Sequence, residues 1–156
     1  MLPTLDARLA AAAELVRPGE PVADIGCDHG KLTAVLAASG KYPKVIGADL
    51  RPGPLAKAEQ TLEHAGCKDR AELRLGDGLS VLTENEVGSI VLAGVSAQTT
   101  WEILEKAPWV FTVGGPRIIM IPATRHDALR RWLWEHGFSF AADRPEIGRA
   151  SCRERV

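Results

Sequence analysis

Carboxylates and glycines alternate closely in the stretch PVADIGCDHGKLT, residues 21–33. Asp24 lies two residues before Gly26, and Asp28 and His29 follow shortly, ahead of a second glycine. Glycines let a backbone turn tightly, and carboxylates favour a ligand that carries positive charge. Because no middle glycine completes the G-x-G-x-x-G fingerprint, a pyrophosphate is a poor candidate for this turn. The stretch therefore predicts a turn that receives the cationic part of a ligand.

Two further carboxylates follow later apolar runs. Asp49 ends the run 44–49, about 20 residues beyond the first turn, where a carboxylate accepts hydrogen bonds from ribose hydroxyls. Gly76, Asp77 and Gly78 follow another run, and Asp77 could accept a hydrogen bond from the exocyclic amine of adenine. A cation-binding turn, a ribose carboxylate and an adenine-side aspartate together describe S-adenosylmethionine, which carries positive charge and no phosphate.

Each of these motifs also has a purely structural interpretation. The first fits a capped turn between a strand and a helix, Asp49 fits a helix cap, and the glycine-flanked Asp77 fits a tight turn. Their occurrence in this order, at the ends of successive apolar runs, favours the cofactor interpretation.

The elements that must position these residues follow from the hydrophobic pattern. Short apolar runs alternate with helical patterns, which is typical of a parallel sheet covered on both faces. Thr124 and Asp127 are spaced as a capping box for the last helix. In such sheets ligands bind at the carboxyl ends of the strands, where all three motifs lie. We expect strands at 21–26, 44–49, 71–76, 88–94, 116–122 and 138–143, and helices at 5–16, 30–39, 53–65, 96–107 and 123–137.

Composition narrows the class of protein. The 156 residues are 46% hydrophobic, which suits one domain with a core. Twenty acidic and nineteen basic residues neither predict nor exclude a nucleic-acid partner. The cysteines form no C-x-x-C pair and the histidines have no metal-ligand spacing, so we expect neither a disulfide framework nor a metal. The sequence has no signal-peptide core and no membrane-length apolar run, which indicates a soluble cytoplasmic protein without a membrane partner.

The motifs DIGCDHGKL, GADLRPGPLAKA, LRLGDGL and VLAG, followed by ALRRWLWEHGF, resemble the bacterial tRNA (adenine-22-N1)-methyltransferase family over residues 4–146. The resemblance implies a Rossmann-like, doubly wound, mostly parallel α/β domain of the class I methyltransferases, followed in the family by a coiled-coil domain. It also implies S-adenosyl-L-methionine as cofactor, tRNA as partner, and methyl transfer to N1 of an adenine.

The resemblance assigns roles by position. The methionine side of the cofactor would be bound by Asp24, Gly26, Asp28 and His29, and the ribose by Asp49 and Leu50. The adenine side would be bound by Gly76, Asp77 and Gly78, and the floor under the sulfonium would be formed by Ala93 and Gly94. N1 of adenine has its own lone pair, so catalysis would consist mainly of positioning and electrostatics. Asp28 is the candidate catalytic residue and His29 the next choice.

The sequence departs from the family pattern in several places, one of which is Gly30-Lys31 where the family has alanine and tyrosine. The fourth strand is followed by AGVSA where the family has A-G-M-G-G, and the fifth by IPAT where it has a Q-P-N motif. Residues 147–156, IGRASCRERV, show no periodicity and look foreign to a methyltransferase domain spanning 1–146. We therefore expect a truncated domain that lacks its last strand and the coiled coil, with an unpaired sheet edge and lowered stability.

Two alternative functions stay open beside methyl transfer to tRNA. One is a methyltransferase of similar fold that acts on a small molecule or a protein. The other is a fold that binds S-adenosylmethionine without catalysing transfer.

Overall fold

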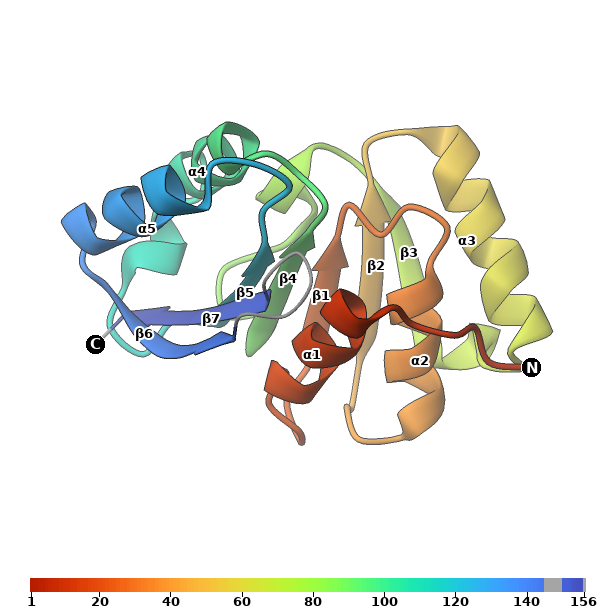
Figure 1. Cartoon of the computed structure of the whole chain (residues 1–156). Helices are drawn as coiled ribbons and strands as arrows, with labels where there is room; N and C mark the ends of the chain where they lie inside the picture. The colour runs from red at the N-terminus through yellow and green to blue at the C-terminus, as the bar shows by residue number, and fades with distance from the viewer. Residues whose placement is uncertain (145–149, 156) are drawn as a thin grey trace.

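The computed structural model describes residues 1–144 and 150–155, which form a sheet with helices on both faces (Figure 1). The strands are β1 (Val22–Ile25), β2 (Val45–Asp49), β3 (Ala71–Leu75), β4 (Ser89–Ala93), β5 (Arg117–Ile121), β6 (Phe138–Arg144) and β7 (Ala150–Arg155). The helices are α1 (Ala7–Leu15), α2 (Lys31–Ser39), α3 (Pro52–His64), α4 (Ala97–Glu105) and α5 (His126–Glu135), with short 3₁₀ helices η1 (Lys68–Arg70), η2 (Gly78–Val81) and η3 (Pro108–Phe111).

The sheet has the order β3-β2-β1-β4-β5-β7-β6. The first five strands in the chain are parallel: β1 pairs with β2 and β4, β2 pairs with β3, and β4 pairs with β5. Strand order reverses at β1, which lies between β2 and β4, as in other doubly wound sheets. The expected fold class is therefore confirmed.

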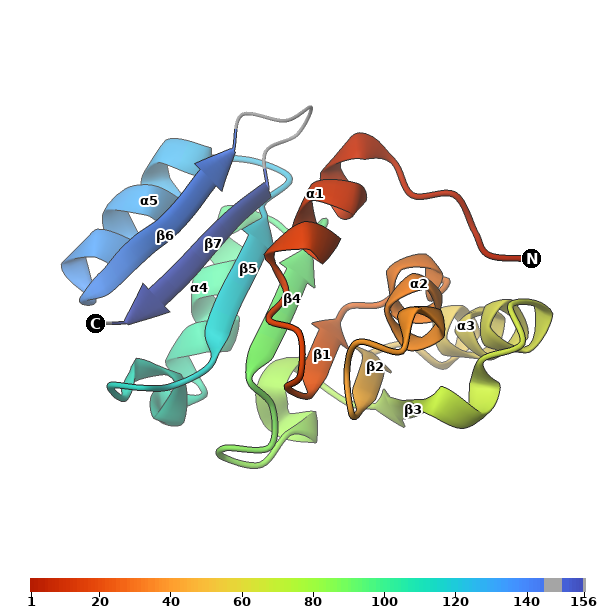
Figure 2. The same ribbon diagram turned by 90° about the horizontal axis from the view of Figure 1, so that it is seen from below.

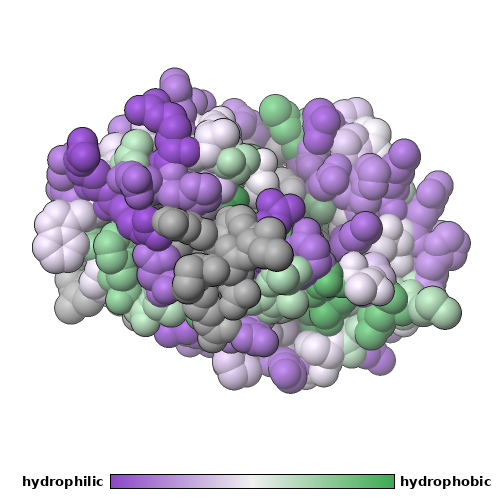
Figure 3. All heavy atoms as spheres, viewed as in Figure 1, coloured by the Kyte–Doolittle hydropathy of each residue, from purple (hydrophilic) through white to green (hydrophobic). Residues whose placement is uncertain are grey.

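Helices α1, α2 and α3 cover one face of the sheet, and α4 and α5 cover the other (Figures 1 and 2). Alternation along β1 shows how the strand serves both layers. Ala23 and Ile25 belong to the core under α4 and α5, whereas Val22 belongs to the core under α1 and α2. The outer surface of α4 and α5 is mostly hydrophilic, and hydrophobic side chains show around α1 and α2 (Figure 3).

The expectation of a missing last strand was wrong. The backbone of β7 runs antiparallel between β5 and β6 and pairs with both, with Ile119 opposite Cys152 and Phe140 opposite Arg153. A strand paired on both sides satisfies its backbone groups whatever its side-chain pattern, which is why the sequence pattern did not indicate it. Strand β5 is thus not an edge strand, so the unpaired edge that was expected to lower the stability is absent at β5.

The helix ends show one further difference. Helix α1 is capped by Asp6, whose Oδ1 accepts a hydrogen bond from the Leu9 N–H at 2.9 Å. The expected capping box of α5 does not form, because Arg125 is the residue before the helix and makes no side-chain cap hydrogen bond. Arg125 has a left-handed backbone with φ of 55°. Its guanidinium carbon Cζ lies 5.9 Å from the centroid of the Trp101 ring, a cation–π contact.

Candidate active site

Asp49, the last residue of β2, anchors the loops at the carboxyl edge of the sheet. Its carboxylate is only 6% exposed. The Oδ2 atom accepts a hydrogen bond from the Asp28 N–H at 3.0 Å, and Oδ1 accepts one from the Arg51 N–H at 3.0 Å. These bonds tie the turn after β1 to the turn after β2, and each carboxylate oxygen keeps acceptor capacity for a ligand.

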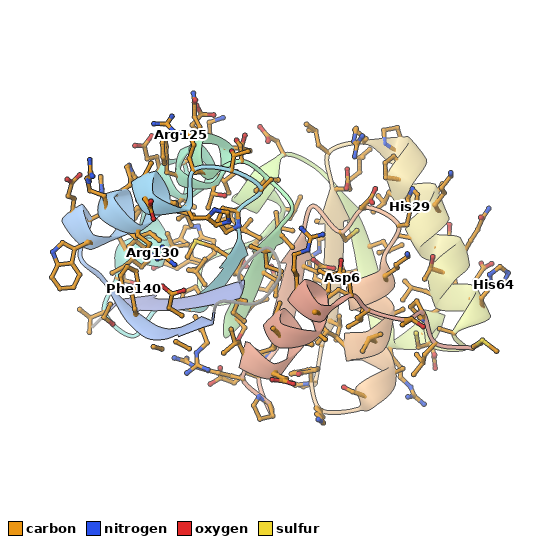
Figure 4. The ribbon with its side chains drawn as sticks, viewed as in Figure 1. Asp6, His29, His64, Arg125, Arg130 and Phe140 are labelled. Carbon is orange, nitrogen blue, oxygen red and sulfur yellow. The ribbon has the colours of Figure 1, made fainter. Side chains whose placement is uncertain are left out.

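The turn after β1 is shaped by three left-handed residues. Gly26, Asp28 and Gly30 have φ of 73°, 52° and 74°. A Cβ at Gly30 would lie 2.8 Å from the Cβ of Ala58, so only glycine lets α3 pack this closely on the turn. The Asp28 side chain is 64% exposed, and its Oδ1 lies 3.8 Å from His29 Nε2. The turn thus presents a carboxylate and an imidazole at the surface, and Figure 4 shows where His29 lies.

Asp24 is a buried carboxylate inside β1 and not part of the turn. It is 3% exposed, and its Oδ2 accepts a hydrogen bond from Thr33 Oγ1 of α2 at 2.8 Å. Burial raises the pKa of Asp24 to about 6, and the nearby charge of Asp49 adds to the effect. A buried carboxylate with one short partner is costly to the fold, which favours a role with a cationic ligand.

Two adjoining cavities open at this edge of the sheet. The first, here called the α1 cavity, has a volume of about 300 Å³ and lies between the starts of α1 and α2. The second, the α4 cavity, has about 420 Å³ and lies among the turns after β1, β2 and β3 and helix α4. Gly26, Asp28, Ala93 and Gly94 line both cavities, so the two form a continuous groove.

The residues predicted from sequence are brought together in this groove. Asp24 and His29 line the α1 cavity, and the α4 cavity is lined by Asp49, Leu50, Gly76, Asp77 and Gly78. The four residues that line both cavities complete the predicted set. Residues from the turns after β1, β2, β3 and β4 therefore meet at one site, as parallel topology requires.

Glycines leave room in the groove or let its walls pack closely. A Cβ at Gly26 or Gly94 would meet no protein atom within 4 Å, so space beside both is open to a ligand. A Cβ at Gly76 would lie 2.5 Å from Val81 Cγ1, so this position needs glycine for packing.

In the AGVSA segment, Ser96 has a structural role, since its Oγ accepts a hydrogen bond from the Thr99 N–H at 3.1 Å and caps α4.

Several lining residues were not identified from the sequence. Arg8 and Leu9 of α1 and Ile121 of β5 line the α1 cavity, and Thr99 and Ile103 of α4 line the α4 cavity. No motif marks them, because their place depends on how α1 and α4 pack against the sheet.

Cys27 and Trp132 have structural surroundings, whereas Trp134 lies at the surface. Cys27 is buried, and burial together with Asp24 raises the pKa of its thiol, which suits an inert side chain. Trp132 is partly buried against the core and stacks on His136 with ring centroids 3.9 Å apart. Trp134 is 69% exposed, with its ring centroid 6.5 Å from that of Phe140 on β6.

Among the side chains that the structure describes, no group of three or more histidine, cysteine or acidic residues could hold a metal ion. None of the described helices is both long enough and apolar enough to cross a bilayer.

Comparison with known proteins gives a consistent result. A family model described as methyltransferase domain matches residues 5–147. The tRNA (adenine(22)-N(1))-methyltransferase of Bacillus subtilis (strain 168) is 30% identical over 135 residues, which are 86% of this chain and 56% of that protein. The chain spans about half the length of the curated relatives it matches.

Solved structures agree with the sequence comparison. The crystal structure of the B. subtilis m1A22 tRNA methyltransferase TrmK is similar with a TM-score of 0.87 at 27% identity, covering 100% of this chain and 68% of that one. Streptococcus pneumoniae Sp1610 in complex with S-adenosyl-L-methionine has a TM-score of 0.84 at 28% identity, covering 98% of this chain and 75% of that one.

Proposed function

This chain belongs to the methyltransferase domain family, and we propose that it binds S-adenosyl-L-methionine and transfers its methyl group to N1 of an adenine in tRNA. The observation that carries the proposal is the convergence of every predicted cofactor residue on one groove at the carboxyl edge of the sheet. We assign the activity to a domain of residues 1–146, to which β7 adds a strand.

The residues of the α4 cavity fit an adenosine. The two oxygens of the buried Asp49 are already oriented by backbone N–H groups and can each accept a hydrogen bond from a ribose hydroxyl. Leu50 is 63% exposed beside this carboxylate and offers an apolar surface to the nucleoside. Asp77 lines the same cavity and would accept a hydrogen bond from the exocyclic amine of adenine.

The α1 cavity fits the methionine part of the cofactor. Asp24 supplies a buried negative charge for an ammonium group, and Gly26 and Gly94 leave open space between the two cavities for the sulfonium. When bound, S-adenosylmethionine supplies an electrophilic methyl group. The side chains of the groove then have to orient the cofactor and exclude water.

Asp28 and His29 are the residues that we assign to the acceptor. The Asp28 side chain is exposed at the junction of the two cavities while its backbone is fixed by Asp49. An ionised carboxylate here can orient the exocyclic amine of the adenine and stabilise the positive charge that the ring gains. His29 lies beside it and can assist in positioning. Because N1 lies on the Watson–Crick edge, a paired adenine would have to leave its pair first.

The relatives support tRNA as the acceptor, since the B. subtilis protein, which this chain resembles both in sequence and in its crystal structure, is an m1A22 tRNA methyltransferase. A tRNA acceptor also favours a cytoplasmic location.

Methyl transfer from labelled S-adenosylmethionine to tRNA that lacks the modification tests the proposal. The expected product is 1-methyladenosine at a single position. Transfer to small molecules or proteins but not to tRNA would contradict the choice of acceptor. Binding of the cofactor without transfer to any acceptor would favour a fold without activity.

A further inference from the structure

A third cavity adjoins the groove on the side where the proposed function places adenine. It has a volume of about 270 Å³, lies between η2, α4 and η3, and is here called the η3 cavity. Four residues line both this cavity and the α4 cavity, namely Asp77, Gly78, Thr99 and Ile103. Of the residues assigned to the cofactor or the acceptor, only Asp77 and Gly78 line it, so S-adenosylmethionine would leave most of this space unfilled.

The inner wall of the η3 cavity is apolar. Leu79, Leu82 and Ala107 are buried in it, and Trp109 of η3 is partly buried against the same core. An apolar cavity of about 150 Å³ is enough to hold benzene. The η3 cavity therefore has the size and the lining to take a neutral aromatic ring. Its polar residues on η2 and around α4 lie at exposed positions, namely Ser80, Thr99, Glu102 and Lys106.

An ion fits this cavity less well than a neutral ring does. The carboxylates of Asp77 and Glu102 disfavour an anion. The buried residues of the wall are aliphatic, so they have no side-chain oxygen or nitrogen to replace the water around a cation.

Gly78 and Ile103 form the boundary between the η3 cavity and the α4 cavity. A Cβ at Gly78 would lie 3.3 Å from Ile103 Cγ1, so α4 packs directly against the turn that follows β3. Asp77 precedes this contact in the chain and lines both cavities. A group attached to an atom that Asp77 binds can therefore extend from the α4 cavity into the η3 cavity.

We propose that the η3 cavity binds an aromatic group carried on the exocyclic nitrogen, N6, of the adenine of the cofactor. The inference rests on the proposed function and adds to it a binding site that the cofactor itself does not fill. The exocyclic amine has two N–H donors, of which Asp77 needs one. A single substituent replaces one hydrogen and keeps the other for Asp77. The class of ligand is therefore an adenosine with one aryl-bearing substituent on N6.

The test measures, by calorimetry, the dissociation constants of S-adenosylhomocysteine, its N6-benzyl derivative and its N6-benzyl-N6-methyl derivative. Glu102→Trp places a large side chain at an exposed position that lines the η3 cavity but not the α4 cavity. Trp109→Ala removes an aromatic part of the wall. Glu105→Trp is the matched control, because Glu105 is an exposed glutamate on the same helix that lines none of the α1, α4 and η3 cavities. Circular dichroism would establish that each variant is folded.

We expect the wild type and Glu105→Trp to bind the N6-benzyl compound about three- to tenfold more tightly than S-adenosylhomocysteine, because the ring leaves water. Glu102→Trp and Trp109→Ala should lose this preference and keep their affinity for S-adenosylhomocysteine. The N6-benzyl-N6-methyl compound should bind about tenfold more weakly than the N6-benzyl compound, since it leaves Asp77 without a donor.

Three results would overturn the inference. If the N6-benzyl compound binds the wild type much more weakly than S-adenosylhomocysteine, the η3 cavity is closed to it. If Glu102→Trp and Trp109→Ala both keep the wild-type ratio of the two affinities, the ring lies in solvent. If the additional methyl group has no effect, N6 is not at Asp77.

A further outcome separates this inference from its premise. If the folded wild type binds neither S-adenosylhomocysteine nor its N6-benzyl derivative, the proposed function itself fails, and the inference fails with it. If the wild type binds S-adenosylhomocysteine but not the derivative, the cofactor site stands and only the role of the η3 cavity is wrong.

Discussion

Asp49 accepts a hydrogen bond from the backbone N–H of Asp28 at 3.0 Å, which joins the ends of two neighbouring strands at the centre of the groove. The bond uses the backbone of Asp28 and leaves its exposed carboxylate available to a ligand. One buried aspartate thus fixes the position of a second aspartate whose side chain faces the groove. In the proposed function, the backbone of Asp28 supports the cofactor site and its carboxylate serves the acceptor. This arrangement separates cofactor binding from acceptor chemistry.

Asp28→Asn tests that separation. Asparagine tolerates the left-handed backbone of this position and keeps the N–H that bonds to Asp49, so the turn should be retained. We expect the rate of methyl transfer to fall by about 10- to 100-fold, because the negative charge near the adenine is lost. Affinity for S-adenosylhomocysteine should change by less. Equal losses of rate and affinity would assign the Asp28 carboxylate to the cofactor.

Asp24→Asn should improve stability and impair binding. Because the pKa of Asp24 is raised to about 6 from an unfolded value near 3.8, the ionised form destabilises the fold by about 2 to 3 kcal/mol at neutral pH. The stability of the free wild type should therefore fall as pH rises from about 4 to about 6. Denaturant unfolding across this range should show the slope in the wild type and not in Asp24→Asn, which should bind S-adenosylhomocysteine more weakly. A less stable Asp24→Asn at pH 7 would contradict this account.

Gly30→Ala and Gly40→Ala form a matched pair at the two ends of α2. Both glycines have left-handed backbones, with φ of 74° and 70°, so both changes cost about 1 kcal/mol of backbone strain. Only at Gly30 would the added Cβ lie 2.8 Å from Ala58 Cβ, whereas at Gly40 it meets nothing within 4 Å. We expect Gly30→Ala to lose an additional 1 to 3 kcal/mol or so in urea unfolding, and to bind cofactor more weakly. Similar losses for the two variants would show that α3 does not constrain the turn.

Glu86→Gln should destabilise the side of the sheet next to β3. Arg74 donates to both oxygens of Glu86, at 2.9 and 2.7 Å, and this pairing lowers the pKa of Glu86 to about 2. The stabilisation is therefore complete above about pH 4.5 and is lost as pH falls toward 2. We expect a loss of about 1 to 2 kcal/mol at pH 7 that shrinks in acid. Glu72→Gln is the control, since Glu72 is a more exposed partner of the same arginine and should have a smaller effect.

The sequence alone was sufficient to predict the parallel strands and the carboxylates at their ends. Apolar runs of strand length show where β1, β2 and β4 lie, and parallel topology places Asp49 and Asp77 at the same edge. The sequence could not indicate Arg8, because its position at the cavity depends on how α1 packs across the sheet. Nor could it indicate that Asp24 is buried against Thr33, which is a property of the assembled layers.

The two wrong predictions, a missing last strand and a capping box at Thr124, also have causes that depend on the folded structure. Strand β7 was missed because pairing with β5 and β6 satisfies its backbone without the apolar alternation on which strand prediction depends. The capping box at Thr124 failed because Arg125 adopts a left-handed turn before α5, a conformation that residue preferences do not suggest for arginine.

Calorimetric titration with S-adenosylhomocysteine of the wild type and Asp49→Ala tests the central claim most directly. Asp69→Ala is the control, because Asp69 is an exposed carboxylate on η1 that lines neither cavity. We predict one site in the wild type and in Asp69→Ala, and a loss of about 100-fold or more in Asp49→Ala, which loses both its ribose contacts and the anchor of the Asp28 turn. A folded wild type that does not bind, or a folded Asp49→Ala that binds as tightly as the wild type, would contradict the account.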